Sequence, residues 1–183
     1  RFSPIDLPAE AGIQEVFRHL AHDEVRTEAI AEDVMRAYDQ GRKVLVLTER
    51  TDHLEAIKGA LGDLTPAPFV LHGRLSKKQR VRLLADLEAL SPDAPRILLA
   101  TGKLVGEGFD HPPLDTLVLA LPVSWKGTLQ QYAGRLHREH ASKTNVRIID
   151  FVDTSHPALL RMWEKRQRGY RTMGYKIGGG EAV

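Results

Sequence analysis

A short run containing glutamine, glycine and two arginines has the composition of a phosphate-binding surface. On a helix, Gln131, Arg135 and Arg138 lie at positions i, i+4 and i+7 and therefore share one face. Arginine binds phosphate through two parallel hydrogen bonds and stabilises the charge of a transferring phosphoryl group. Gly134 weakens the predicted helix, so we expect another backbone or a ligand to approach it closely. The alternative interpretation is a solvated basic face with a chance glycine.

A glycine-rich loop at residues 100–110 begins where a predicted strand ends. Thr101 and Lys103, with the backbone N–H of Gly102, are suited to hold a phosphate of a nucleic-acid backbone. Asp110 is suited to accept hydrogen bonds from ribose hydroxyls. Ordinary turn chemistry explains these glycines and the Asp-His-Pro-Pro run equally well, so the loop by itself does not decide between the two interpretations.

Several common catalytic motifs are missing from the sequence. It has no G-x-x-x-x-G-K-[ST] loop, no G-x-G-x-x-G after the first predicted strand and no G-x-S-x-G. The absence of cysteine excludes a disulfide, a thiol nucleophile and a thiolate zinc site. Two His-x-x-His pairs lack the glutamate and the third ligand of a zinc enzyme. We therefore expect no metal site, and no unaided binding of a nucleoside triphosphate with its magnesium ion.

Length and composition set further limits. The 183 residues suffice for one domain with a real core, and 42% hydrophobic with 27% charged residues excludes a wholly disordered chain. No apolar run approaches the roughly 18 residues of a membrane span and no signal peptide opens the chain, so we expect no membrane partner. Because the chain begins at Arg1, we expect it to be part of a longer protein.

The charge is distributed unevenly along the chain. Residues 1–123 carry 15 basic and 19 acidic side chains, whereas residues 124–183 carry 11 and 5. The last third is therefore the better candidate to meet an anion. The final predicted helix is either a nucleic-acid surface or a solvated face whose other side reaches the core. Around its Trp163 and Tyr170, the cations of this helix are Arg161, Lys165, Arg166, Arg168 and Arg171.

Apolar strands alternate with amphipathic helices in the predicted fold. The predicted strands are residues 43–48, 68–72, 96–101, 116–121 and 145–152, and the predicted helices are 23–38, 51–61, 76–90, 128–138 and one from 157 that ends before Gly174. This pattern predicts a single α/β domain with a mostly parallel sheet covered by helices on both faces. We expect residues 1–22 to form a leader or interdomain connection, 23–174 the domain, and 175–183 a flexible tail. Ligands of such sheets bind beyond the carboxyl ends of the strands.

The two phosphate-binding candidates occur in order and are separated by one predicted strand. Together they resemble motifs V and VI of superfamily 2 helicases of the DEAD/DEAH-like class, and the likeness extends over residues 23–174. Residues 107–110 resemble the end of motif V, with Glu107 in place of the usual arginine, and residues 131–138 match Q-x-x-G-R-x-x-R at each fixed position. Residues 121–138 resemble most closely bacterial relatives of the type III restriction helicase subunit. The resemblance implies that the chain is the C-terminal RecA-like domain of such an enzyme.

Roles follow from this resemblance residue by residue. Arg138 matches the arginine finger that reaches the γ-phosphate of ATP, and Arg135 matches the other arginine of motif VI. The residues that match positions near the nucleotide are Gln131, Gly108, Asp110 and Glu107. The residues expected along the nucleic-acid backbone are Thr101, Gly102, Lys103, Gly73, Arg74 and Arg50.

The resemblance also implies partners for the chain. ATP and Mg²⁺ would be bound mainly by an N-terminal RecA-like domain of the same protein. DNA is the implied polymer, with RNA as the alternative, and a bacterial cytoplasmic protein with a nuclease or restriction partner fits the same likeness. Two other functions stay open: a catalytically silent module that binds nucleic acid, and a free-standing nucleotide-dependent transferase on a doubly wound fold.

Overall fold

The computed structural model describes residues 7–64, 66–102, 109–123, 129–141 and 143–178. Its strands are β1 (Lys43–Thr48), β2 (Phe69–Leu71), β3 (Arg96–Thr101), β4 (Thr116–Leu119) and β5 (Arg147–Asp150). Its helices are α1 (Ile13–His22), α2 (Glu24–Asp39), α3 (Thr51–Leu61), α4 (Lys77–Glu88), α6 (Gln130–Leu136) and α7 (Pro157–Thr172). Among these helices, none combines the length and the apolar character that crossing a bilayer requires.

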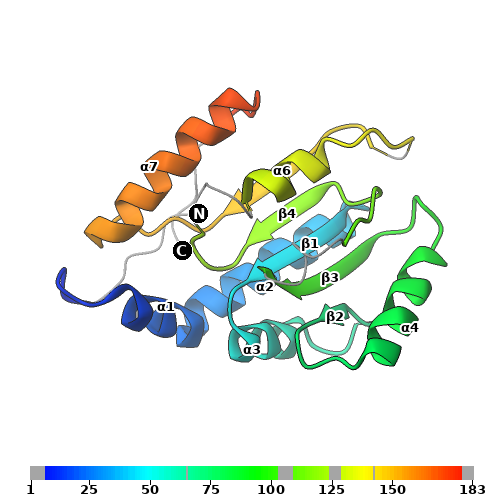
Figure 1. Ribbon diagram of the computed structural model, residues 1–183, viewed down its shortest axis with the longest axis horizontal. Coiled ribbons are helices and arrows are strands. Elements are labelled where there is room, and N and C mark those ends of the chain that lie inside the picture. Colours follow the sequence, from blue (N-terminus) through cyan, green and yellow to red (C-terminus); the bar gives the residue numbers. More distant parts are fainter. Residues whose placement is uncertain (1–6, 65, 103–108, 124–128, 142, 179–183) are drawn as a thin grey trace.

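The five strands form one parallel sheet in the order β2-β3-β1-β4-β5 (Figure 1). Side chains alternate along each strand, so Leu45 of β1 lies beside Leu98 of β3 on one face, while Val46 lies on the other. The first face packs against α4, α6 and α7, and the second packs against α2 and α3. The predicted fold class, a parallel α/β sheet with helices on both faces, is confirmed.

Local signals in the sequence set several helix ends. The Asp23 side chain accepts a hydrogen bond from the backbone N–H of Arg26, 3.0 Å away, at the start of α2. Ser76 and Gln79 form a reciprocal capping box at the start of α4. After α7 the chain reverses at Gly174, whose φ of +83° suits glycine.

The segment predicted as a leader contains a helix that the sequence pattern did not indicate. Val16 and Leu20 of α1 are buried in a small cluster with Leu121 and with Leu159 of α7. This cluster lies just past the carboxyl end of β4, so α1 packs onto the domain. The domain boundaries themselves stay predictions.

A buried ion pair joins α2 to the sheet. Within α2 the apolar Val25 is 65% exposed, whereas Arg26 is fully buried. The Arg26 guanidinium donates to both oxygens of Asp153, at 3.0 and 3.1 Å, and to the backbone carbonyls of Ala120 and Phe151. It therefore ties α2 to the chain just beyond β4 and β5.

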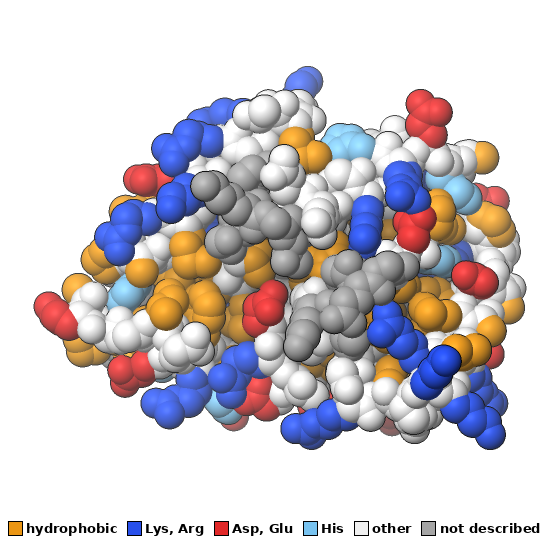
Figure 2. All heavy atoms as spheres, viewed as in Figure 1, with side chains coloured by type: hydrophobic (Ala, Val, Ile, Leu, Met, Phe, Trp, Pro, Cys, Tyr) orange, Lys and Arg blue, Asp and Glu red, His pale blue; other side chains and the backbone are white. Residues whose placement is uncertain are grey.

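A second buried pair attaches α7. The Arg166 guanidinium binds both oxygens of Asp150, at 2.7 and 3.1 Å, and donates to the carbonyl of Val123. Tyr170 donates its hydroxyl to Asp150 and also packs in the core. The other cations of this helix are exposed, and Figure 2 shows Lys and Arg side chains gathered over α7; they are Arg161, Lys165, Arg168 and Arg171.

Candidate functional site

The last residues of the glycine-rich loop, 109 and 110, lie against α6 and the turn that follows it. The guanidinium of Arg138 forms an ion pair with the carboxylate of Asp110. The guanidinium of Arg135 donates to the backbone carbonyl of Phe109, with an N–O distance of 2.6 Å. Residues 109 and 110 of the glycine-rich loop and the arginine run, which belong to the two separately predicted phosphate-binding candidates, therefore form one surface. On it, Asp110 is the carboxylate that offsets the positive charge of the arginine run.

The helix that carries this surface is shorter than predicted. We predicted a helix over residues 128–138, but α6 ends at Leu136, and Arg138 lies in the turn that follows. Gln131 and Arg135 are on the helix, with Gln131 exposed and Arg135 partly buried. Gln131 and Arg135 therefore share a face of α6. Arg138, whose side chain is 56% exposed, lies beyond the helix and is not on that face.

Gly134 does not need close contact within this chain. A Cβ placed there would meet no heavy atom within 4 Å among the described residues. The close approach that we predicted for Gly134 is therefore not made by the described part of this domain.

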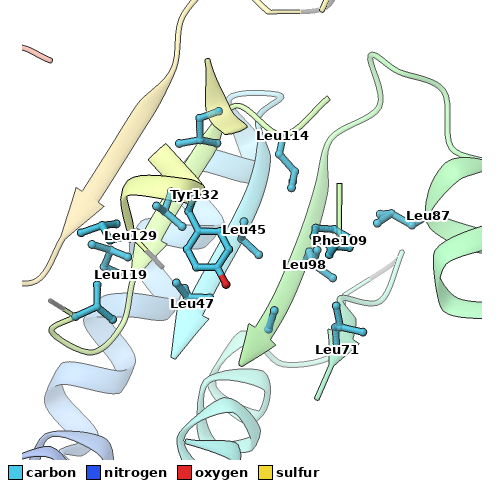
Figure 3. Close-up of a cluster of buried hydrophobic side chains, with 14 of the residues drawn as sticks. Leu45, Leu47, Leu71, Leu87, Leu98, Phe109, Leu114, Leu119, Leu129 and Tyr132 are labelled. Atoms are coloured by element: carbon cyan, nitrogen blue, oxygen red, sulfur yellow. The ribbon is translucent and has the colours of Figure 1, made fainter. Parts of the chain in front are cut away.

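Tyr132 connects α6 to the end of β3 and was not among the predicted site residues. Its side chain is 2% exposed and lies among Leu45, Leu47 and Leu129 (Figure 3). Its hydroxyl donates to the backbone carbonyl of Gly102. Burial raises the pKa of this phenol above its ordinary value of 10, so the hydroxyl stays protonated in alkaline solution as well as at neutral pH. Its helical spacing from Leu136 marks the apolar side of α6, but the contact with Gly102 depends on the tertiary fold.

The predicted nucleic-acid contacts gather at the carboxyl edge of the sheet. Thr101 ends β3 and Gly102 follows it, Arg50 follows β1, and Gly73 with Arg74 follows β2. Because the strands are parallel, these ends lie along one edge. Gly73 and Arg74 are exposed, Thr101 is partly exposed and Gly102 is buried. The parallel fold thus brings the described members of this predicted set to one edge.

An unpredicted carboxylate also occupies this edge. Glu49 follows β1, and a Cβ added to Gly102 would collide with its carboxylate. Burial raises the pKa of the Glu49 carboxyl. Within the described part of the chain it makes no hydrogen bond or ion pair. A phosphate held at the Gly102 backbone would lie near this carboxylate, which would oppose its binding.

Arg50 is also engaged in this structure. Its guanidinium forms two hydrogen bonds with the carboxylate of Asp52, at 2.9 and 2.5 Å. The hydrogen bonds from Arg50 lower the pKa of Asp52. Arg50 is 34% exposed, so it reaches solvent with part of its guanidinium while Asp52 holds the rest.

Three predicted site residues, Lys103, Glu107 and Gly108, lie outside the described residues. Within the described ranges, no three His, Asp or Glu side chains are arranged to hold a metal ion. The described site therefore consists of the arginines of α6 and its following turn, the Phe109–Asp110 segment and the carboxyl edge of the sheet.

Comparison with protein families identifies a match over much of this domain. Residues 26–140 match the model of the helicase conserved C-terminal domain. "Uncharacterized protein 108L" of Invertebrate iridescent virus 3 is 41% identical over 96 residues, which are 52% of this chain and 86% of that protein. "Probable helicase D10" of Escherichia phage T5 is 24% identical, and "Transcript termination protein A18" of Fowlpox virus is 28% identical. The matched regions cover 75% and 74% of this chain but 30% and 29% of those two proteins.

Solved structures share the fold at low sequence identity. T4 UvsW aligns with a TM-score of 0.68 and 20% identity, covering 94% of this chain and 39% of that one. The structure of Mss116p DEAD-box helicase domain 2 bound to an RNA duplex aligns with a TM-score of 0.58 and 14% identity, covering 87% and 60%. These alignments confirm the expected RecA-like fold.

Proposed function

The chain belongs to the helicase conserved C-terminal domain family, and from this membership we propose that it is the second motor domain of an ATP-dependent nucleic-acid helicase or translocase. Such a domain supplies half of an ATP site, while the phosphate-binding loop and the acids that hold Mg²⁺ belong to a first motor domain. The absence of a G-x-x-x-x-G-K-[ST] loop from this sequence agrees with that division. The observation that carries the proposal is the meeting of Arg135 and Arg138 with the Phe109–Asp110 segment.

In this proposal Arg138 is the arginine finger. Its guanidinium is 56% exposed and is held by one carboxylate, that of Asp110, which is 37% exposed. A γ-phosphate presented by the first motor domain would carry more negative charge than Asp110 and would compete for the same guanidinium. Arg135, anchored on the carbonyl of Phe109, would keep the two segments together while Arg138 changes partner. The other proposed nucleotide contacts are Gln131, Asp110, Glu107 and Gly108.

The carboxyl edge of the sheet is the proposed nucleic-acid track, with DNA as the substrate and RNA as the alternative. The family membership and the position of this edge support the proposal. Its proposed contacts are Thr101, Gly102, Lys103, Gly73, Arg74 and Arg50. Three statements stay predictions from the resemblance: a relation to type III restriction helicase subunits, a nuclease or restriction partner, and a bacterial cytoplasmic location.

Replacing Arg138 tests the proposed function. In the full-length protein we expect Arg138→Ala to lower the ATPase kcat by about 10³-fold, because an arginine finger contributes that much or more to phosphoryl transfer. The Kd for a labelled single-stranded oligonucleotide should stay within about threefold, since Arg138 lies away from the carboxyl edge. Arg82→Ala, which removes an exposed arginine of α4, is the matched control.

Two results would contradict the proposal. An unchanged ATPase in Arg138→Ala, together with intact oligonucleotide binding, would favour the catalytically silent module. Robust Mg²⁺-dependent ATP hydrolysis by the isolated 183-residue chain would show that the domain does not need a partner domain.

A further inference from the structure

The turn that carries Arg138 is closed by a lysine from the segment that follows it. After α6 the chain passes through Arg138 and reverses near His140, where the backbone N–H of Lys143 donates to the His140 carbonyl at 3.0 Å. The Lys143 ammonium then reaches back to the turn. It donates to the carbonyl of Leu136, 3.0 Å away, and to the carbonyl of Arg138, 2.9 Å away.

These carbonyls need a partner for a general reason. The last carbonyls of a helix have no donor in the next turn, and a lysine near the carboxyl end satisfies them and interacts favourably with the helix dipole. At the end of α6 the backbone supplies short-range bonds, from His137 N–H to Gly134 and from Arg138 N–H to Arg135. Among the described residues, the carbonyls of Leu136 and Arg138 accept from the ammonium of Lys143, which is a charged and therefore strong donor.

The charges around Lys143 belong to the same surface as Arg138. Burial lowers the pKa of the Lys143 ammonium, the carboxylates of Asp115 and Asp110 raise it, and the Arg138 guanidinium lowers it. Asp110 thus acts on both cations: it pairs with Arg138 and it stabilises the charged form of Lys143. The ammonium holds the backbone of the turn, while Asp110 holds the side chain that the turn presents.

We propose that Lys143 is a positioning residue for Arg138, fixing the turn so that the guanidinium reaches the γ-phosphate of ATP bound to the partner domain. The proposal rests on the proposed function. When Arg138 leaves Asp110 for a phosphate, its side chain loses its only ion-pair anchor among the described residues, and the bond from Lys143 to the Arg138 carbonyl then holds the backbone in place. A displacement of about 1 Å in a catalytic group lowers rates by up to about 10²-fold, so a turn held by two hydrogen bonds matters to the rate.

The test uses the full-length protein and steady-state ATPase kinetics. Lys143→Met should lower kcat by about 10-fold to 10²-fold and change the KM for ATP by less than about threefold, because the partner domain holds most of the nucleotide. Lys143→Arg retains a charged donor and should stay within about threefold of the unmodified enzyme. Lys58→Met, at an exposed position on α3, is the matched control and should leave kcat unchanged.

A double mutant separates positioning from general stability and from failure of the proposed function. If Lys143 acts through Arg138, adding Lys143→Met to Arg138→Ala should lower kcat no further. Two results would overturn the positioning role and leave the arginine-finger role intact. In the first, the kcat reductions of the two single variants multiply in the double variant. In the second, Lys143→Met keeps a kcat within twofold of the unmodified protein while Arg138→Ala loses most of its ATPase activity. Full activity of Arg138→Ala itself would overturn the proposed function instead. If Lys143→Met does not fold by circular dichroism, Lys143→Gln replaces it under the same criteria.

Discussion

Replacing Arg26 by methionine should be among the most damaging single changes to the stability of this domain. The Arg26 and Asp153 side chains are fully buried, and the guanidinium is bonded to Asp153, to the carbonyl of Ala120 and to the carbonyl of Phe151. Methionine roughly preserves the volume but leaves the Asp153 carboxylate buried without its charge partner. It also removes the donors of two backbone carbonyls that lie just past β4 and β5.

The expected loss in the free energy of unfolding is about 3–5 kcal/mol, the usual result of removing one partner from a buried ion pair. Arg82→Met in α4 provides the scale, because the two side chains of the Arg82–Asp86 pair are 86% and 63% exposed. Exposed pairs contribute about 0–1 kcal/mol, so the two substitutions should differ by several kcal/mol.

The penalty should also depend on pH. Burial raises the pKa of Asp153 to about 6 from its ordinary 3.8, although Arg26 opposes the shift. Without Arg26 the pKa rises further, and the folded state then binds a proton more tightly than the unfolded chain. A group of this kind makes stability fall as pH rises between the unfolded and folded pKa values. The loss caused by Arg26→Met should therefore be larger near pH 8 than near pH 5.

Urea unfolding followed by circular dichroism, on the 183-residue chain and at both pH values, measures these differences. The double variant Arg26→Met, Asp153→Leu removes both charges and should recover most of the loss, since an apolar pair is tolerated where a lone charge is not. A loss for Arg26→Met no larger than that for Arg82→Met, or a loss that shrinks from pH 5 to pH 8, would refute the reasoning.

Two further predictions concern the edge of the sheet and a helix cap. Glu49→Gln removes a negative charge beside Gly102, so it should tighten the binding of a labelled single-stranded oligonucleotide by about fivefold at low salt. The gain should be smaller at about 0.2 M salt, because salt screens the charge. Fluorescence anisotropy measures the Kd, and weaker binding would argue against a phosphate contact there. Ser76→Ala should lower the free energy of unfolding by about 1 kcal/mol, because it removes the acceptor of the Gln79 N–H bond at the start of α4. Thermal melts measure this loss, and Ser91→Ala, at an exposed position outside the helices, is the control.

The strongly patterned parts of the sequence predicted the fold well. The continuous apolar runs of β1 and β3 occur at the predicted residues, and the Ser76–Gln79 capping box is present at the start of α4. Such signals depend on neighbours within a few positions, so they can be interpreted from the chain itself. The short helix α1 lacks a comparably regular pattern and was not predicted; its buried Val16 and Leu20 contact residues about one hundred or more positions away.

The types of residue at the site, and their order along the chain, were evident from the sequence: the two arginines of residues 131–138, the glycine-rich loop before them and the strand between. The tertiary structure decided their partners. Asp110 pairs with Arg138, Tyr132 reaches Gly102, and Glu49 shares the edge assigned to phosphate. The reason is physical: local sequence sets which face of a helix is apolar, but the energy of a charged group depends on how far it is desolvated and on which charge lies opposite. Arg26 shows this most clearly, because burying it is tolerable only beside Asp153, 127 positions further along the chain.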